Sequence, residues 1–141
     1  MFAACPDVPF ALLGGAGAPA LPPRPNVVDL RGRTDVRQAI DVAATARAFV
    51  GIDSGLAHAA AIARVPTVVA MPQATTGYFF PYPRAFGAHV VTVQSPAHAV
   101  CSGCGGICVH EPIWRSRRIG FPCLRAVAAD DVVAALRRAL A

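Results

Sequence analysis

Lysine is absent from this chain, and charged residues of any kind are scarce. All 13 basic residues are arginines, and only 15% of the 141 residues are charged, which leaves a net charge of +5. The arginines are scattered and not interleaved with aromatic side chains, which argues against a nucleic-acid-binding protein. A guanidinium group binds phosphates and carboxylates through a planar set of donors, so the composition suits an anionic ligand or an acidic surface. A GC-rich genome that favours arginine codons explains the same composition.

The sequence also lacks a long apolar run and a leader segment. Its longest apolar candidate, Leu56 to Met71, is interrupted by Arg64 and falls short of the roughly 18–20 residues that cross a bilayer. The start, MFAACPDVPF, has no basic region followed by a long apolar stretch, so we expect no signal peptide. We therefore expect a cytoplasmic protein, with at most peripheral contact at the inner membrane face.

The chain does have many short apolar segments, and 55% of its residues are hydrophobic, enough for the core of one domain. Strands are expected at 9–15, 26–30, 48–52, 67–71 and 89–93. Helices are expected from Thr34, as the N-cap, to about 46, at 55–64 and at 130–141. The expected inward face of the first helix consists of Val36, Ala39, Ile40 and Ala43. Short apolar strands separated by helices or long loops are typical of an α/β fold with a parallel sheet buried on both faces.

A polar group, Asp53-Ser54-Gly55 with His58 behind it, separates the strand at 48–52 from the alanine-rich helix after it. In a strand–loop–helix unit this loop lies at the carboxyl end of the sheet, where open α/β folds bind ligands. Ser54 can cap the helix, Gly55 lets a ligand approach the backbone, and the free N–H groups of the first turn attract an anion. His58 could donate a further hydrogen bond to that anion. The pattern indicates a phosphate-binding site.

Two other interpretations of this group stay open. A Ser–His hydrolase would use Ser54 as its nucleophile, but the required order Gly-x-Ser-x-Gly differs from the Gly-Ile-Asp-Ser-Gly at 51–55, so the spacing fails. Alternatively, Ser54 is only a helix cap and His58 is an ordinary helix residue whose hydrogen bonds are satisfied within the protein. In that case the segment binds nothing.

The segment FVGIDSGLAHAAAIARVPTVVAM resembles the donor-binding segment of family nine glycosyltransferases, the ADP-heptose–lipopolysaccharide heptosyltransferases. That family carries Asp-Ser/Thr-Gly-x-x-His between a strand and a small-residue helix. VPFALLGG, NVVDLRGRTDVRQAIDVAATARAFVGIDSG and CLRAVAADDVVAALRRAL resemble further parts of the family, so the resemblance covers nearly the whole chain. It implies the C-terminal half of a GT-B fold, a Rossmann-like parallel sheet with flanking helices that binds the nucleotide sugar.

The resemblance also implies a site and a reaction. The donor, expected to be ADP-heptose, would contact Asp53, Ser54, Gly55, Leu56 and His58, with Gly14, Gly15 and Thr75 as further donor-binding positions. A sugar would be transferred with inversion to a lipopolysaccharide-type acceptor, whose hydroxyl a carboxylate base activates. In the family that base and the acceptor site belong to the N-terminal half, so the catalytic residue of this chain is unknown.

The chain departs from the family pattern because it does not contain that N-terminal half, and this decides what we expect of its 141 residues. They would form a single nucleotide-sugar-binding domain over 1–141 that is incomplete at its N-terminal end, because the first strand and helix of the family's donor half are missing. A separate acceptor-binding half or a homo-oligomer would then complete the enzyme. The alternative is a non-catalytic nucleotide-sugar-binding or interaction module with a metal-stabilised finger.

A C-x2-C-x3-C-x14-C pattern occurs in an irregular, glycine-rich segment over 95–125, which we expect to be an insertion before the last helix. Its members are Cys101, Cys104, Cys108 and Cys123. Four thiols in a cytoplasmic protein suggest a structural metal, zinc by default or iron, while a disulfide or redox pair and unligated thiols stay open. His98 and His110 are substitute ligands. Cys5 is expected to be a small buried residue.

Overall fold

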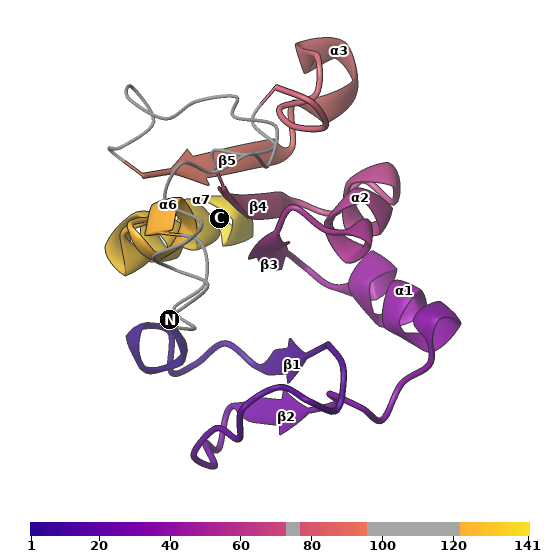
Figure 1. Ribbon diagram of the computed structural model, residues 1–141, viewed down its shortest axis with the longest axis vertical. Coiled ribbons are helices and arrows are strands. Elements are labelled where there is room, and N and C mark those ends of the chain that lie inside the picture. Colours follow the sequence, from indigo (N-terminus) through magenta and orange to yellow (C-terminus); the bar gives the residue numbers. More distant parts are fainter. Residues whose placement is uncertain (73–76, 96–121) are drawn as a thin grey trace.

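The computed structural model describes residues 1–72, 77–95 and 122–141, which form an α/β fold (Figure 1). The helices and strands in chain order are η1 Phe2–Ala4, β1 Phe10–Leu12, β2 Val27–Asp29, α1 Val36–Thr45, β3 Phe49–Ile52, α2 Gly55–Ile62, β4 Thr67–Met71, α3 Arg84–Gly87, β5 Val90–Gln94, α6 Pro122–Arg125 and α7 Ala129–Leu140. All five predicted strands are confirmed, as are the three predicted helices. Within these described ranges no helix is long and apolar enough to cross a membrane.

The strands form two parallel sheets. One has the order β3-β4-β5 and the other consists of β1 and β2. In the larger sheet β4 is paired on both sides, and its residues Thr67, Val68, Val69 and Met71 are completely buried. Strand β3 is paired on one side only, and it is half-buried to exposed along its length. The predicted parallel sheet is therefore confirmed, but in the described residues it is divided between β1 and β3.

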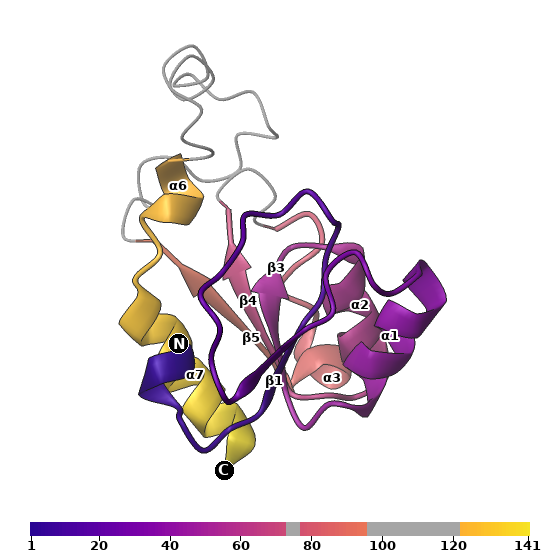
Figure 2. The ribbon, with the colours of Figure 1, turned by 90° about the horizontal axis from the view of Figure 1, so that it is seen from below.

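Helices cover both faces of the larger sheet, with α7 on one face and α2, backed by α1, on the other (Figure 2). Because successive side chains of a strand point to opposite faces, Val68 packs with Ala135 of α7 and Val69 packs with Ala57 of α2. Three alanines of α2, at 57, 60 and 61, are buried, which lets the helix lie close to the sheet.

The amino-terminal segment packs against α7 (Figure 2). Cys5 is buried, as predicted, and it contacts Val133 and Leu136 of α7. A guanidinium nitrogen of Arg137 donates a hydrogen bond to the carbonyl oxygen of Ala4 at 2.7 Å. The two ends of the described chain are thereby held together, and η1 is fixed next to the last helix.

The N-cap predicted for α1 is wrong by one residue. Asp35 is the cap, because its Oδ1 accepts the Gln38 N–H at 2.8 Å and the Gln38 Oε1 accepts the Asp35 N–H at 3.0 Å. This reciprocal pair satisfies two backbone donors at once. Thr34 could not form such a reciprocal pair, because the residue three positions later is Arg37, whose side chain can only donate.

The predicted inward face of α1 is only partly correct. Ala39 and Ala43 are buried, and Ala43 contacts Ala60 of α2. Val36 is 76% exposed and Ile40 is 39% exposed, because the contact between α1 and α2 is made through small side chains. Helical periodicity identified the correct half of the helix but not which of its apolar residues reach the core.

The capping pair of α1 gives a direct test of this fold. Replacing Asp35 by Ala removes the hydrogen bond that its carboxylate accepts from the Gln38 N–H, and it should lower the free energy of unfolding by about 1 kcal/mol. Thr34→Ala is the matched control, because Thr34 caps nothing, and it should change stability by less than about 0.5 kcal/mol. Urea denaturation of the two variants checks this; equal losses in both would contradict the observed cap.

Candidate functional site

The predicted polar group forms the turn from β3 into α2. Strand β3 ends at Ile52 and α2 begins at Gly55, so only Asp53 and Ser54 make the turn. Ser54 is extended, and its Oγ accepts the Ala57 N–H at 3.4 Å, which confirms its predicted role as helix cap. In the described part of the chain the backbone N–H groups of Gly55 and Leu56 have no hydrogen-bond partner. They are the donors that a helix N-terminus offers to an anion.

Gly55 leaves the start of α2 open. A methyl group built on Gly55 would meet no atom of the described chain within 4 Å, so the space beside the first residue of the helix is open. Gly15 is equally open, and Gly14 accepts the Gly32 N–H through its carbonyl at 2.9 Å. Both glycines follow β1, which belongs to the two-stranded sheet, whereas the turn at Ser54 follows β3 of the larger sheet. The predicted donor-binding residues therefore come from two different sheets.

His58 is held by protein groups on both of its ring nitrogens. Its Nε2 lies 3.5 Å from Asp53 Oδ1, and its Nδ1 is hydrogen-bonded to the Tyr82 hydroxyl. The imidazole also stacks on Phe80, with ring centroids 4.4 Å apart and an angle of 7° between the planes. The hydrogen bond expected from His58 to an anion stays a prediction; it would replace the long contact with Asp53.

Tyr82 completes this arrangement and was not found by sequence reasoning. Burial raises the pKa of its phenol, and the nearby negative charge of Asp53 raises that pKa further. The phenol therefore stays protonated at neutral pH, and it can donate its proton to His58 Nδ1 while Nε2–H faces Asp53. We assign this tautomer from the network of hydrogen bonds. The one available signal was the aromatic cluster at 78–82 in a chain with only 7% aromatic residues.

The remaining predicted site residues lie mostly outside the described chain. Thr75, Cys101, Cys104 and Cys108 belong to this group, together with most of the predicted insertion. Cys123 is described, and its thiol is free and half-buried. Among the described residues no group of three or more His, Cys, Asp or Glu side chains could hold a metal ion. The structural metal stays a prediction.

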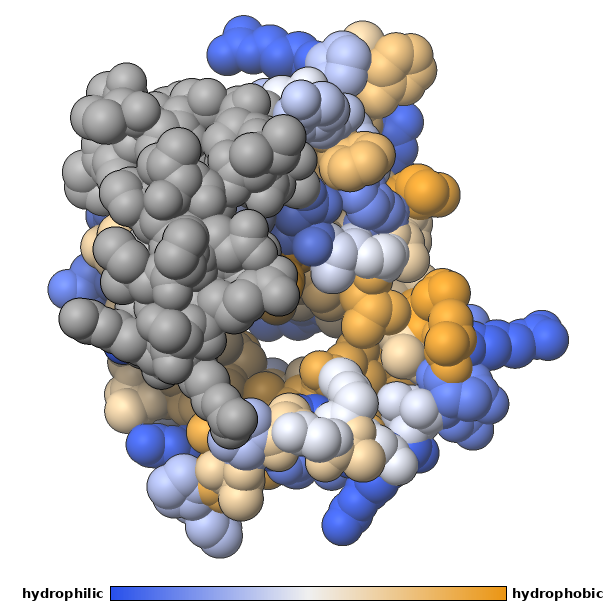
Figure 3. Space-filling model, viewed as in Figure 1, coloured by the Kyte–Doolittle hydropathy of each residue, from blue (hydrophilic) through white to orange (hydrophobic). Residues whose placement is uncertain are grey.

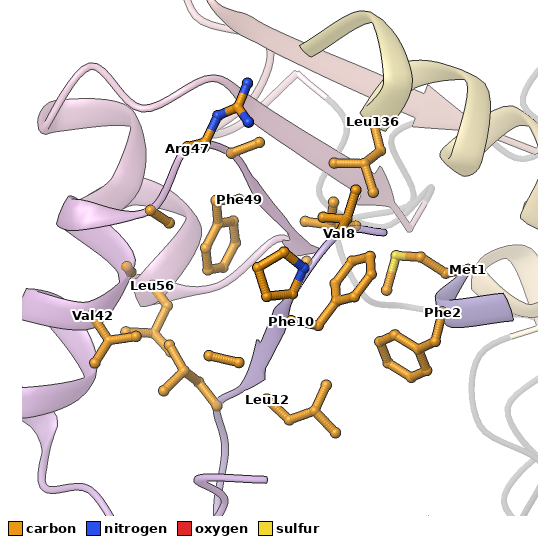
Figure 4. A pocket seen from close by; sticks show the side chains of 18 of the residues that line it. Met1, Phe2, Val8, Phe10, Leu12, Val42, Arg47, Phe49, Leu56 and Leu136 are labelled. Atoms are coloured by element: carbon orange, nitrogen blue, oxygen red, sulfur yellow. The ribbon is translucent and has the colours of Figure 1, made fainter. Parts of the chain in front are cut away.

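A large apolar cavity reaches the start of α2 from the other side. Its volume is about 650 Å³, and it lies between β1 and β3, with Ser54 and Leu56 in its wall. Figure 4 shows Phe10, Phe49 and Leu136 around it, contributed by β1, β3 and α7. The turn at Asp53-Ser54 thus separates a polar, open surface at the helix start from an apolar interior space.

The comparison with protein families decides the identity. Residues 18–100 match the model of glycosyltransferase family 9 (heptosyltransferase). This chain belongs to glycosyltransferase family 9. The matched segment contains the turn at Asp53-Ser54, α2 and the aromatic cluster, whereas Gly14 and Gly15 precede it and the four clustered cysteines follow it.

Family 9 membership gives the chain a glycosyltransferase context and implies a nucleotide-sugar donor. The parallel sheets with flanking helices are consistent with the Rossmann-like half of a GT-B enzyme. Searches of curated proteins and of solved structures return no significant match. The identification therefore rests on the family model, with the strand–turn–helix geometry at Ser54 in agreement with it.

The hydrogen bond between Tyr82 and His58 can be removed by deleting a single heavy atom, the phenol oxygen of Tyr82. Tyr82→Phe leaves Nδ1 of a partly buried imidazole without a partner, which should lower the free energy of unfolding by about 1 kcal/mol. Tyr78→Phe is the matched control, because Tyr78 is 65% exposed, and it should have little effect on stability.

The pH dependence of stability supplies a second readout for the same variant. The raised pKa means that the folded chain favours the neutral form of the Tyr82 phenol. The contribution of the neutral phenol to the free energy of unfolding is therefore complete below about pH 10, and it is lost as the pH rises through the pKa of the folded state. Urea denaturation at a series of pH values should show this alkaline loss in the unmodified chain and a smaller loss in Tyr82→Phe. Identical alkaline profiles would contradict the burial of this phenol.

Proposed function

We propose that this chain binds the nucleotide-sugar donor of a heptosyltransferase, with ADP-heptose as the donor, for transfer to a lipopolysaccharide-type acceptor. One observation supports this most: the open N–H groups of Gly55 and Leu56 at the carboxyl end of a parallel sheet. A diphosphate is the part of the donor that such a helix start recognises, because several backbone donors and the positive end of the helix dipole act together on it.

The neighbouring side chains suit the sugar end of the donor, where the sugar joins its phosphate. The Asp53 side chain is only 9% exposed, and its carboxylate faces Nε2 of His58, so a negative charge already lies beside the helix start. The His58 side chain is 28% exposed and is fixed in orientation by Tyr82 and Phe80. We assign Asp53 and His58 to the sugar or to the phosphate oxygens nearest it, and Leu56 to a backbone contact.

The proposed transfer needs a second set of groups. The bond between the anomeric carbon and the phosphate oxygen breaks, the acceptor oxygen bonds to that carbon from the opposite face, and the acceptor proton passes to a carboxylate base. The nucleoside diphosphate is the leaving group of this reaction, and it stays bound at the helix start while the bond breaks. We assign the base and the acceptor site to a separate acceptor-binding half, and donor binding to this chain as one domain.

Gly55 gives a test that leaves the fold intact. Gly55→Ala adds a methyl group that meets no atom of the described chain but occupies the open space at the helix start, so stability should not fall while ADP-heptose binding weakens at least about tenfold. Titration calorimetry with ADP-heptose, and with UDP- and GDP-sugars for comparison, measures this.

The control for that variant lies at the other end of the same helix. Ile62 is 78% exposed, and Ile62→Ala should leave the affinity for ADP-heptose unchanged. The proposed site is wrong if the folded, unmodified chain binds none of these nucleotide sugars. It is also wrong if Gly55→Ala binds ADP-heptose as tightly as the unmodified chain does.

A further inference from the structure

Phe79 is an exposed aromatic side chain in contact with the proposed donor site. Exposed apolar side chains are common on proteins and need no function; Figure 3 shows a group of them over α1, which exposes Val36 and Ile40. Phe79 is 59% exposed, but its ring lies edge-on to the imidazole of His58, with ring centroids 6.0 Å apart and an angle of 79° between the planes. An apolar surface therefore lies directly beside polar groups assigned to the donor.

The residues around Phe79 hold its backbone in place. Gly77 has a φ of +85°, a conformation that favours glycine, and its N–H donates to the carbonyl oxygen of Phe80 at 2.9 Å. Phe80 is completely buried and stacks on His58, and Tyr82 is hydrogen-bonded to the same imidazole. Because the segment is anchored on this imidazole, a ligand that covers the ring of Phe79 has little backbone left to order.

Asp53 contributes the polar part of the same surface. Its side chain is only 9% exposed, and its contact with Nε2 of His58 is long, at 3.5 Å. Among the described residues no group donates a hydrogen bond to this carboxylate. Buried carboxylates normally accept hydrogen bonds, so Asp53 has acceptor capacity left for a ligand. An ionised diphosphate has no hydrogen to donate to it, whereas the hydroxyl groups of a sugar do.

A carboxylate, an N–H donor and an aromatic ring side by side suit a sugar. The hydroxyl groups around a sugar ring exchange hydrogen bonds with polar side chains, and its C–H groups form an apolar face that packs against an aromatic ring. In a nucleotide sugar the transferred sugar is bonded directly to the diphosphate, whereas the ribose separates the base from it. With the diphosphate at the start of α2, the sugar is therefore the ring that reaches Asp53 and Phe79.

We propose that Phe79 is a specificity-determining residue of the donor site, against which the C–H face of the transferred sugar packs while the sugar hydroxyls donate to Asp53. This inference rests on the proposed function, because it takes the diphosphate to lie at the amides of Gly55 and Leu56. Phe79 then adds to the affinity for the intact nucleotide sugar and adds nothing to the affinity for ADP.

Comparing ADP-heptose with ADP isolates this contact. Phe79→Ala should weaken ADP-heptose binding at least about fivefold and change ADP binding by less than about twofold. Phe79→Trp keeps a flat aromatic surface and should retain most of the affinity for ADP-heptose. Titration calorimetry on the full chain measures the four affinities against those of the unmodified chain.

The matched control is the neighbouring aromatic residue. Tyr78 is 65% exposed, and among the described side chains its ring contacts no other ring. Tyr78→Ala should therefore leave the affinities for ADP-heptose and for ADP unchanged. An equal loss of ADP-heptose binding in Tyr78→Ala and Phe79→Ala would show a general effect of aromatic surface and would overturn the inference.

The unmodified chain gives a second readout that does not depend on any variant. In the full chain saturated with ADP-heptose, nuclear Overhauser effects should connect the ring protons of Phe79 to the C–H protons of the heptose. Those heptose protons should also move upfield, because they lie over the face of an aromatic ring. The H2 and H8 protons of adenine should show no such effect to Phe79.

The inference is overturned if Phe79→Ala weakens ADP and ADP-heptose equally, or if the Overhauser effects run from Phe79 to adenine, because the ring then lies against the nucleoside. Bound heptose without any effect to Phe79 also overturns it. In these cases ADP-heptose still binds, so the proposed function stands. If the folded, unmodified chain binds neither ADP-heptose nor ADP, both are wrong. If Phe79→Ala does not fold, as judged by circular dichroism, the Overhauser effects decide.

Discussion

The site depends on how abruptly the chain passes from β3 into α2. Pairing with β4 fixes the end of β3, and the helix begins directly after the Ser54 cap, so the two-residue turn between them is too short to fold over the helix start. The buried alanines of α2 hold the helix against Val69, and Gly55 has no side chain to cover the amides. Two N–H groups without a partner among the described residues are therefore presented at a fixed position, which is the physical basis of the proposed donor binding.

A second constraint ties this turn to the segment before α3. His58, one turn into α2, links Asp53 at the end of β3 to Tyr82, and its ring lies on the buried Phe80. The imidazole is therefore fixed by a carboxylate, a phenol and an aromatic face at once. A group held in this way is better suited to orienting a ligand than to serving as a mobile general base, which agrees with assigning the base to an acceptor-binding half.

The sequence predicted those features that depend on local pattern. Continuous apolar runs located all five strands, and the group at Asp53-Ser54-Gly55 was correctly placed at a strand–helix turn with Ser54 as the cap. The cap of α1 was misplaced because Thr34 and Asp35 are both good caps, and only the pairing with Gln38 decides between them. The contact of Tyr82 with His58 and the cavity between β1 and β3 could not be predicted, because each depends on segments far apart in the sequence meeting in space.

The central claim is that a diphosphate is held by the first backbone amides of α2. The most direct measurement is an NMR titration of the full chain with ADP-heptose that follows the amide resonances. The Gly55 and Leu56 amides should shift most, with smaller changes at His58, and ADP alone should move the same two amides. Tight binding with Gly55 and Leu56 unmoved, or no shifts at all, would contradict it.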